Sequence, residues 1–277
     1  MTLRQLDPGM APEAISQIDA MLADIRREHG VHMPWAIESG SRAWGFPSPD
    51  SDYDARFFYV RPAEQALTVW PRRDVIERPI VGDLDVNGWD LAKALRLILK
   101  GNAVVIEWLN SPIIYGGEVW FRDLLLAFAQ AWIDRDRLAA HYLYLTRRHR
   151  ESDLSAGGEV KLKKLFYALR PAAAVAWMQA HPERKIPPMK FRDLMSECGA
   201  PEEVKALSED LIRRKAVTRE LGSGEPPPEL LAFIDQCLAA GDAFRVRGQP
   251  PAPGAAEAAD ELFVAVTRRL DEAGPAD

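Results

Sequence analysis

The chain has 277 residues, of which 47% are hydrophobic and 27% charged, an ordinary globular composition with enough length for one large or two smaller domains. Its formal net charge of −6 argues against coating nucleic acid without regard to sequence, because that activity needs a net basic surface, but it leaves room for a local basic groove. Cys198 and Cys237 are the only cysteines, so the sequence has neither a disulfide framework nor a cysteine-based zinc site.

No segment of the sequence has the pattern of a targeting or membrane-spanning element. The opening text, MTLRQLDPGMAPEAIS, lacks the apolar stretch found in signal peptides. No run approaches the ~18 apolar residues that a membrane span requires. We therefore expect a cytoplasmic protein that does not associate with a membrane.

The first part of the chain predicts one helix followed by strands. Apolar residues recur at helical spacing over 14–28, and Gly30 follows as a stop signal. Four segments have the composition of strands, namely 31–39, 53–60, 74–77 and 84–87. The text GFPSPDS between the first two of them is rich in turn and cap residues, so it predicts a loop.

The pattern changes to helix at Asp90. Apolar residues share one helical face from Leu91 onward, with Asp90 as the N-terminal cap and Gly101 as the end. Residues 104–109 favour another short helix, although their apolar run is also compatible with a strand. Residues 111–117 are expected to form an extended segment.

The remainder of the chain is almost wholly helical in pattern. The expected helices are 119–133, 134–150, 158–180, 190–197, 201–220, 227–240 and 256–272, separated by Gly- and Pro-rich signals. This shift predicts two domains, 1–117 and 118–277. The expected fold class is α+β, with an all-helical second domain.

Two aspartates, Asp52 and Asp54, open the second predicted strand. Side chains at i and i+2 of a strand point to one face, so the two carboxylates should lie side by side. Both should be ionised at pH 7, and their repulsion is costly unless a cation lies between them. Oxygen-only ligation suits Mg²⁺, and two such ions can activate an attacking oxygen and stabilise a leaving pyrophosphate. For an isolated Asp-x-Asp, a loop end that faces solvent is the more common explanation, and the Gly-Ser pair upstream shifts the balance.

A third carboxylate for such a site is expected on a neighbouring strand, and the text GDLDVNGWD contains three candidates. Asp85 lies between Leu84 and Val86, so it should point away from the core that these two residues enter. Asp83 follows a glycine and is better explained as a turn residue, and Asp90 as a helix cap. Asp85 is therefore the predicted third carboxylate.

The pair Gly40-Ser41 ends the first predicted strand. A glycine there allows close approach of a ligand and tolerates positive φ, while a hydroxyl and exposed backbone N–H groups can cradle phosphate oxygens. Arg42 adds a donor that could bind phosphate or pair with a nearby aspartate. The sequence thus predicts a phosphate cradle and a metal site on adjacent strand ends.

At this point the sequence resembles a known family. The arrangement of Gly40-Ser41, Asp52-x-Asp54 and Asp85 is similar to the signature of the DNA polymerase β-type nucleotidyltransferase superfamily. Over roughly residues 36–195 the sequence resembles one branch of this superfamily. That branch is the group of nucleotidyltransferases named for an RNA repair pathway and associated with RNA ligases. The segments that carry the resemblance are SGSRAWGFPSPDSDYDARFFYV, LDVNGWDLAKAL, IEWLNSPIIY, KLKKLFYALRPAAAVAWM and IPPMKFRDLM.

The resemblance implies a small mixed-sheet domain similar to the polymerase β palm, followed by the helical domain. It implies that Asp52, Asp54 and Asp85 bind two Mg²⁺ or Mn²⁺ ions, and that Gly40 and Ser41 contact the β- and γ-phosphates of an NTP such as ATP. In the implied reaction an acceptor attacks the α-phosphate and pyrophosphate leaves. The expected acceptor is an RNA end, and an RNA ligase is the expected partner.

A basic segment in the helical part offers further candidates for substrate contacts. Lys163, Tyr167 and Arg170 fall at i, i+4 and i+7, which is one helix face, while the apolar residues between them would pack inward. With the resemblance, contacts of these three residues to triphosphate or base become as well supported as the alternative, a solvated basic face. The clusters TRRHR at 146–150 and RRK at 213–215 are expected to be solvated helix faces, and the alternative is that together they form an RNA groove beside the acidic site.

Two other functional hypotheses remain compatible with the sequence. The same chemistry could act on a small molecule, such as an aminoglycoside antibiotic, or on a protein side chain. Alternatively, the chain could be a catalytically silent nucleotide-binding or toxin-neutralising module. The presence of all three carboxylates favours the enzyme.

Overall fold

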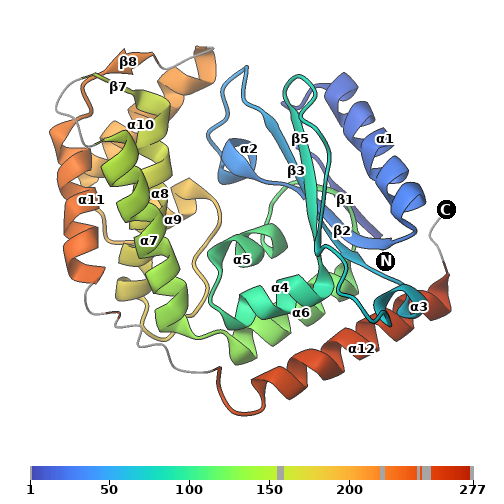
Figure 1. Ribbon diagram of the computed structural model, residues 1–277. Helices are drawn as coiled ribbons and strands as arrows, with labels where there is room; N and C mark the ends of the chain where they lie inside the picture. Colours follow the sequence, from blue (N-terminus) through green and yellow to red (C-terminus); the bar gives the residue numbers. More distant parts are fainter. Residues whose placement is uncertain (1, 155–158, 219–221, 242–243, 245–250, 275–277) are drawn as a thin grey trace.

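A computed structural model describes residues 2–154, 159–218, 222–241, 244 and 251–274 (Figure 1). Its first part contains a six-stranded sheet with the strand order β1-β6-β2-β3-β5-β4. The strands are β1 (Thr2–Gln5), β2 (His32–Glu38), β3 (Tyr53–Val60), β4 (Val75–Glu77), β5 (Leu84–Asp90) and β6 (Ile114–Glu118). β3 and β5 run parallel, and the other neighbouring pairs of this sheet are antiparallel. The predicted α+β class with a mixed sheet is confirmed.

Helices cover both faces of this sheet (Figure 1). One face is covered by α1 (Pro12–His29), and the other by α4 (Leu91–Leu99), α5 (Ala103–Leu109) and α6 (Val119–Trp132). Alternation along β3 sends Tyr53 and Phe57 into the core under α1, and Phe58 and Val60 into the larger core on the opposite face. The position of a residue along its strand therefore decides which layer it faces.

The second part of the chain is helical around a buried central helix. This part contains α7 (Arg135–Asp153), a 3₁₀ turn (Leu162–Lys164), α8 (Leu165–Ala180), α9 (Phe191–Glu197), α10 (Glu202–Val217), α11 (Pro228–Ala240) and a small pair of strands, β7 (Val160–Lys161) and β8 (Ser223–Gly224). Most side chains of α8 are buried between its neighbours. The larger core continues from the sheet through α5 into α7, α8 and α11, so it crosses the position of the predicted domain boundary.

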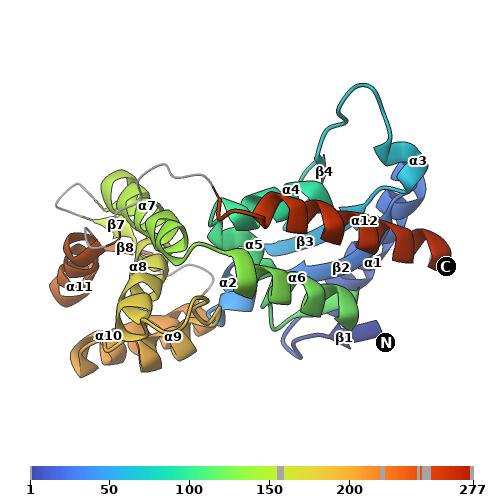
Figure 2. The same ribbon diagram turned by 90° about the horizontal axis from the view of Figure 1, so that it is seen from below.

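The last helix returns to the first part of the molecule. α12 (Ala255–Ala273) lies against α4, α6 and the short helix α3 (Ala63–Ala66), as Figures 1 and 2 show. Its Asp271 carboxylate binds His32 Nε2 at 3.0 Å and accepts a hydrogen bond from Ala63 N at 3.0 Å. The helical residues of the C-terminal half therefore do not all belong to one layer.

Most predicted elements are present with small differences at their ends. The helix predicted over 158–180 begins later, at Leu165, because residues 160–161 pair with β8 and the following turn is 3₁₀. Residue 158 and residues 219–220, where two helices were expected to start and end, lie outside the described residues. β1 was not predicted. In the part of the chain that the structure describes, no helix is long and apolar enough to cross a membrane.

Candidate active site

Three segments that carry the predicted site residues meet at one end of the sheet. β2 pairs antiparallel with β3, with Glu38 opposite Ala55, so the end of β2 lies beside the start of β3. β5 runs parallel to β3, with Asp85 opposite Asp54. The neighbours of both aspartates along the strands enter the core under α1, so the two carboxylates face the other side of the sheet.

Arg56 joins these two carboxylates. Its Nη2 donates to Asp54 Oδ1 at 2.9 Å and to Asp85 Oδ2 at 2.7 Å, and its Nη1 donates to the backbone oxygens of Ala55 and Asp85. Arg56 follows Asp54 by two residues on β3 and so shares its face. The guanidinium offsets part of the repulsion between the carboxylates, for which the sequence predicted a metal ion. Arg56 was not among the predicted site residues, although its i+2 spacing from Asp54 was visible in the sequence.

The charge of Asp54 is unfavourable in this environment. Burial raises the pKa of its carboxyl, the Arg56 guanidinium opposes this shift, and the charges of Asp85 and Asp52 reinforce it. Asp52 itself is exposed, just before β3. The three predicted carboxylates are thus electrostatically coupled, and an added cation would relieve their mutual repulsion.

Gly40 opens the short helix α2 (Gly40–Trp44) and lies directly against Asp54. Its φ is 60°, in the left-handed region that favours glycine. A Cβ at this position would lie 2.0 Å from Asp54 Oδ2, which is far inside van der Waals contact. The glycine is therefore explained by two separate requirements, a positive φ and the close approach of the carboxylate.

The loop between α2 and β3 is held by serines and by Arg42. Ser41 Oγ donates to Ser51 Oγ at 3.0 Å, and Ser51 Oγ also accepts from Ser48 N at 2.8 Å. Arg42 donates to the backbone oxygens of Ser51 at 2.6 Å and Asp52 at 3.2 Å. Arg42 therefore pairs with backbone oxygens of the loop, whereas the sequence suggested phosphate or a carboxylate as its partner.

Sequence reasoning missed Glu38, the fully buried last residue of β2. Its Oε1 accepts from Asp54 N at 2.9 Å, and its Oε2 accepts from the Tyr115 hydroxyl at 2.5 Å. Burial raises the pKa of Glu38 to about 7, and the hydrogen bond from Tyr115 opposes this shift. Glu38 fixes the start of β3 relative to β2 and β6. The sequence did contain a signal for this residue, because Glu38 is an acidic residue at the end of a mainly apolar strand.

A cleft of about 520 Å³ opens at these strand ends. Gly40, Ser41, Asp52 and Asp54 line it from the sheet side, and Lys163 and Tyr167 line it from the helical side. Six of the nine predicted site residues are thus brought to one cavity. Arg42, Asp85 and Arg170 are not part of its lining, and Asp85 is reached from the cleft through Arg56.

Aromatic side chains form another part of the cleft wall. Trp89 stacks on Trp108 with ring centroids 4.0 Å apart and an interplanar angle of 28°. Trp44 contacts Tyr167 edge-on at 6.2 Å. All four rings line the cleft, and Trp108 is buried behind Trp89, so Trp44, Trp89 and Tyr167 offer the apolar surfaces on which a nucleobase can stack.

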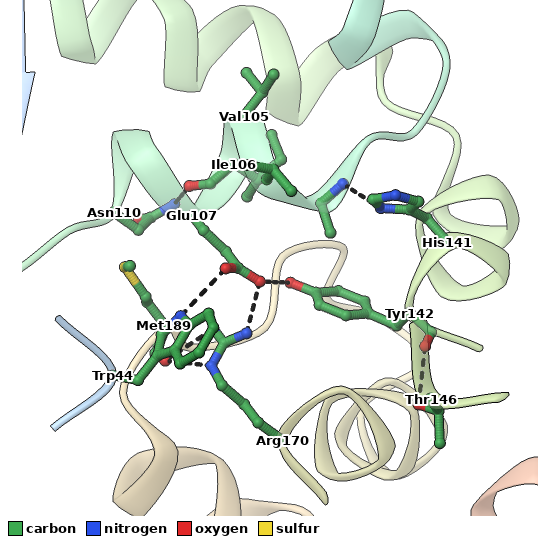
Figure 3. Close-up of polar contacts among 12 residues, drawn as sticks. Trp44, Val105, Ile106, Glu107, Asn110, His141, Tyr142, Thr146, Arg170 and Met189 are labelled. Atoms are coloured by element: carbon green, nitrogen blue, oxygen red, sulfur yellow. Dashed lines mark hydrogen bonds and ion pairs between the residues drawn. The ribbon is translucent and has the colours of Figure 1, made fainter. Parts of the chain in front are cut away.

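Arg170 lies in a buried network behind the cleft (Figure 3). Its Nη1 donates to Glu107 Oε1 at 2.7 Å, its Nε and Nη2 donate to Met189 O, and only 3% of the residue is exposed. Its guanidinium lies 4.8 Å from the Trp44 ring centroid, and Trp44 Nε1 donates to Glu107 Oε2 at 3.3 Å. Arg170 shares a helix face with Tyr167 as predicted. It is buried, however, and contacts Trp44, whose ring forms part of the cleft wall.

The three predicted carboxylates at this end of the sheet have the chemistry that suits a hard cation, but they are not gathered into a metal site. Among the residues that the structure describes, no three His, Cys, Asp or Glu side chains lie close enough together to hold a metal ion. Asp52, Asp54 and Asp85 nevertheless supply only carboxylate oxygens, the ligands that Mg²⁺ and Mn²⁺ prefer. The absence of a side chain at Gly40 leaves room at Asp54 Oδ2.

The chain belongs to the RNA repair pathway DNA polymerase beta family (RlaP), whose pattern matches residues 14–265. The resemblance seen over roughly residues 36–195 is therefore confirmed and extends further toward the C-terminus. Nucleotidyl transfer is the class of chemistry that this membership supports.

Two similar proteins give context to this assignment. YcgL of Bacillus subtilis (strain 168), an uncharacterized protein, is 44% identical over 200 residues, which cover 72% of this chain and 76% of YcgL. A crystal structure of a nucleotidyltransferase-like protein from Exiguobacterium sibiricum 255-15 aligns with a TM-score of 0.31 and 12% identity, over 94% of this chain and 89% of that one.

Proposed function

We propose that this protein is a metal-dependent nucleotidyltransferase that transfers a nucleoside monophosphate from an NTP to an RNA end. The observation that carries the proposal is the register of Asp54 with Asp85 on parallel strands, with Gly40 against Asp54 at the edge of a cleft. The family to which the chain belongs supports both the chemistry and the acceptor. In the proposed reaction an RNA hydroxyl or phosphate oxygen bonds to the α-phosphorus, and the bond to the β,γ-pyrophosphate breaks.

Asp52, Asp54 and Asp85 would hold the metal, Mg²⁺ or Mn²⁺. When bound, the metal supplies positive charge to the phosphate oxygens and to the leaving pyrophosphate. Arg56 forms ion pairs with Asp54 Oδ1 and Asp85 Oδ2, so a cation that binds these two oxygens would compete with its guanidinium. Arg56 would thus reduce the repulsion between the two carboxylates.

The substrate contacts would come from both sides of the cleft. The Ser41 hydroxyl and the backbone at Gly40 would bind phosphate oxygens, and Lys163 would add positive charge from the helical side. Tyr167 and Trp44 would contact the nucleoside through their rings. Arg170 would act through Trp44, as a positioning residue.

The test is transfer of label from α-labelled NTPs to total RNA in the presence of Mg²⁺ or Mn²⁺, with wild type and Asp52→Asn compared. Loss of one charged metal ligand should remove several kcal/mol of transition-state stabilisation, so labelling should fall about 10²- to 10³-fold. Equal labelling of RNA by both proteins would contradict the proposal. Label found only on an aminoglycoside or on protein in parallel reactions would replace the RNA acceptor by that acceptor.

Gly40→Ala should lower the activity more than Gly45→Ala, although both glycines have positive φ. Each substitution incurs the left-handed backbone strain of about 1–2 kcal/mol. Only the Cβ at Gly40 also collides with Asp54 Oδ2, because a Cβ at Gly45 meets no atom within 4 Å. The labelling assay should show a further loss of about tenfold or more for Gly40→Ala. Equal activity of the two variants would show that the contact with Asp54 is unimportant.

A further inference from the structure

Lys215, near the end of α10, is a buried cation in the wall of the cleft. Only 6% of the residue is exposed, whereas its neighbours Arg213 and Arg214 are exposed. The sequence therefore predicted the surroundings of these two arginines correctly and those of Lys215 wrongly. The difference arises because Lys215 turns toward the loop that follows α2.

The ammonium of Lys215 has few partners in this position. Its Nζ donates to Phe46 O at 2.7 Å and lies 5.3 Å from the Phe46 ring centroid. Over the described residues, no carboxylate lies within ion-pair distance of this Nζ. An ammonium has three N–H donors, and a buried charge without a counter-ion is costly, so the site is short of negative charge.

Charged groups near Lys215 increase this deficit of negative charge. Burial lowers the pKa of Lys215 to about 8, the Asp50 carboxylate opposes this shift, and the charges of Lys163 and Arg42 reinforce it. Asp50 is exposed at the cleft, and Lys163 lines the same cleft. The charges that act on Lys215 are thus those of two cations and one solvated carboxylate, an arrangement that favours an added anion.

We propose that Lys215 and Lys163 together form a binding subsite for the polyphosphate group of the nucleotide. This inference rests on the proposed function and adds a residue from the region after 195, to which the family resemblance carried no site residue. A polyphosphate brings several charged oxygens, which can accept from the unused donors of Lys215 while its bond to Phe46 O persists. Phe46 N in turn donates to Ser41 O, so the subsite is attached to the Gly-Ser element.

The binding test uses calorimetric titration with inorganic tripolyphosphate and with ATP, each in MgCl₂. Lys215→Met keeps the apolar stem and removes the charge, and Arg214→Met removes an exposed charge from the adjacent position. Lys215→Met should bind about tenfold or more weakly, as expected for a lost charge-assisted hydrogen bond, and Arg214→Met should bind like wild type. Affinities of Lys215→Met equal to those of wild type would overturn the inference.

A second measurement separates phosphate binding from a purely structural tie between α10 and the loop. At pH 8.5 a lysine with a pKa of about 8 is largely neutral, and a bound anion favours its charged form. Titration of wild type in two buffers of different ionisation enthalpy should therefore reveal proton uptake that Lys215→Met lacks. Binding by wild type without this difference would overturn the inference alone. Binding of neither probe by wild type would overturn the proposed function as well.

Discussion

Replacement of Asp54 by asparagine should abolish nucleotidyl transfer without lowering the stability of the fold. The substitution removes a carboxylate proposed to hold the metal, so we expect kcat/KM to fall about 10²- to 10³-fold or more. Stability should be unchanged or higher at pH 7, because the raised pKa of Asp54 means that the fold disfavours its charge. Arg56 keeps its ion pair with Asp85.

The matched control is Asp83→Asn, which removes one negative charge two residues before Asp85. Asp83 is exposed, and it is the aspartate that the sequence assigned to a turn. Its backbone oxygen accepts from Tyr53 N, a bond that the substitution leaves in place. Label transfer and urea unfolding of both variants should show lost activity for Asp54→Asn alone. A parallel loss of stability in Asp54→Asn would mean that the carboxylate is primarily structural.

Replacement of Arg170 by methionine should have the largest effect on stability. Glu107 and Arg170 form an ion pair with 8% and 4% of their side chains exposed, and truncating one partner leaves the other charge buried. Such a loss typically lowers the free energy of unfolding by about 3–5 kcal/mol. The measurement is urea unfolding of wild type and Arg170→Met at pH 7.

Two further variants establish whether the buried charge is the cause. Adding Glu107→Gln to Arg170→Met should recover part of the lost stability, because the uncompensated carboxylate is gone. Arg150→Met, which breaks a more exposed ion pair with Asp235, should cost only about 0–1 kcal/mol. A loss below about 1 kcal/mol for Arg170→Met would contradict this account of the network.

The carboxylates illustrate what could be predicted from the sequence. The side of the sheet to which Asp54 and Asp85 point depends on the alternation of side chains along a strand. This alternation is local and can be seen in the sequence around each residue. Their placement on neighbouring strands was expected from the chemistry of a metal site, and the register places Asp85 opposite Asp54. The sheet-side half of the cleft was therefore largely predictable.

The helical side of the cleft was less predictable, because spacing along a helix defines a face but not what covers it. Tyr167 and Arg170 lie on α8, whereas Lys163 lies in the 3₁₀ turn before it. α5 and α2 bury Arg170 and leave Lys163 and Tyr167 at the cleft. Lys215 was expected in solvent and is buried by the loop around Phe46. Both outcomes depend on contacts between residues far apart in the sequence, which no local pattern encodes.

The return of α12 to the sheet has a consequence for how the molecule is made. Its apolar side chains, including Val266 and Leu270, are buried in the larger core, which also contains Leu91 and Phe121. During synthesis the sheet and its first helices leave the ribosome well before α12 does. The surface that α12 covers therefore stays exposed to water until α12 itself emerges, so this side of the sheet domain is completed well after the sheet has been translated.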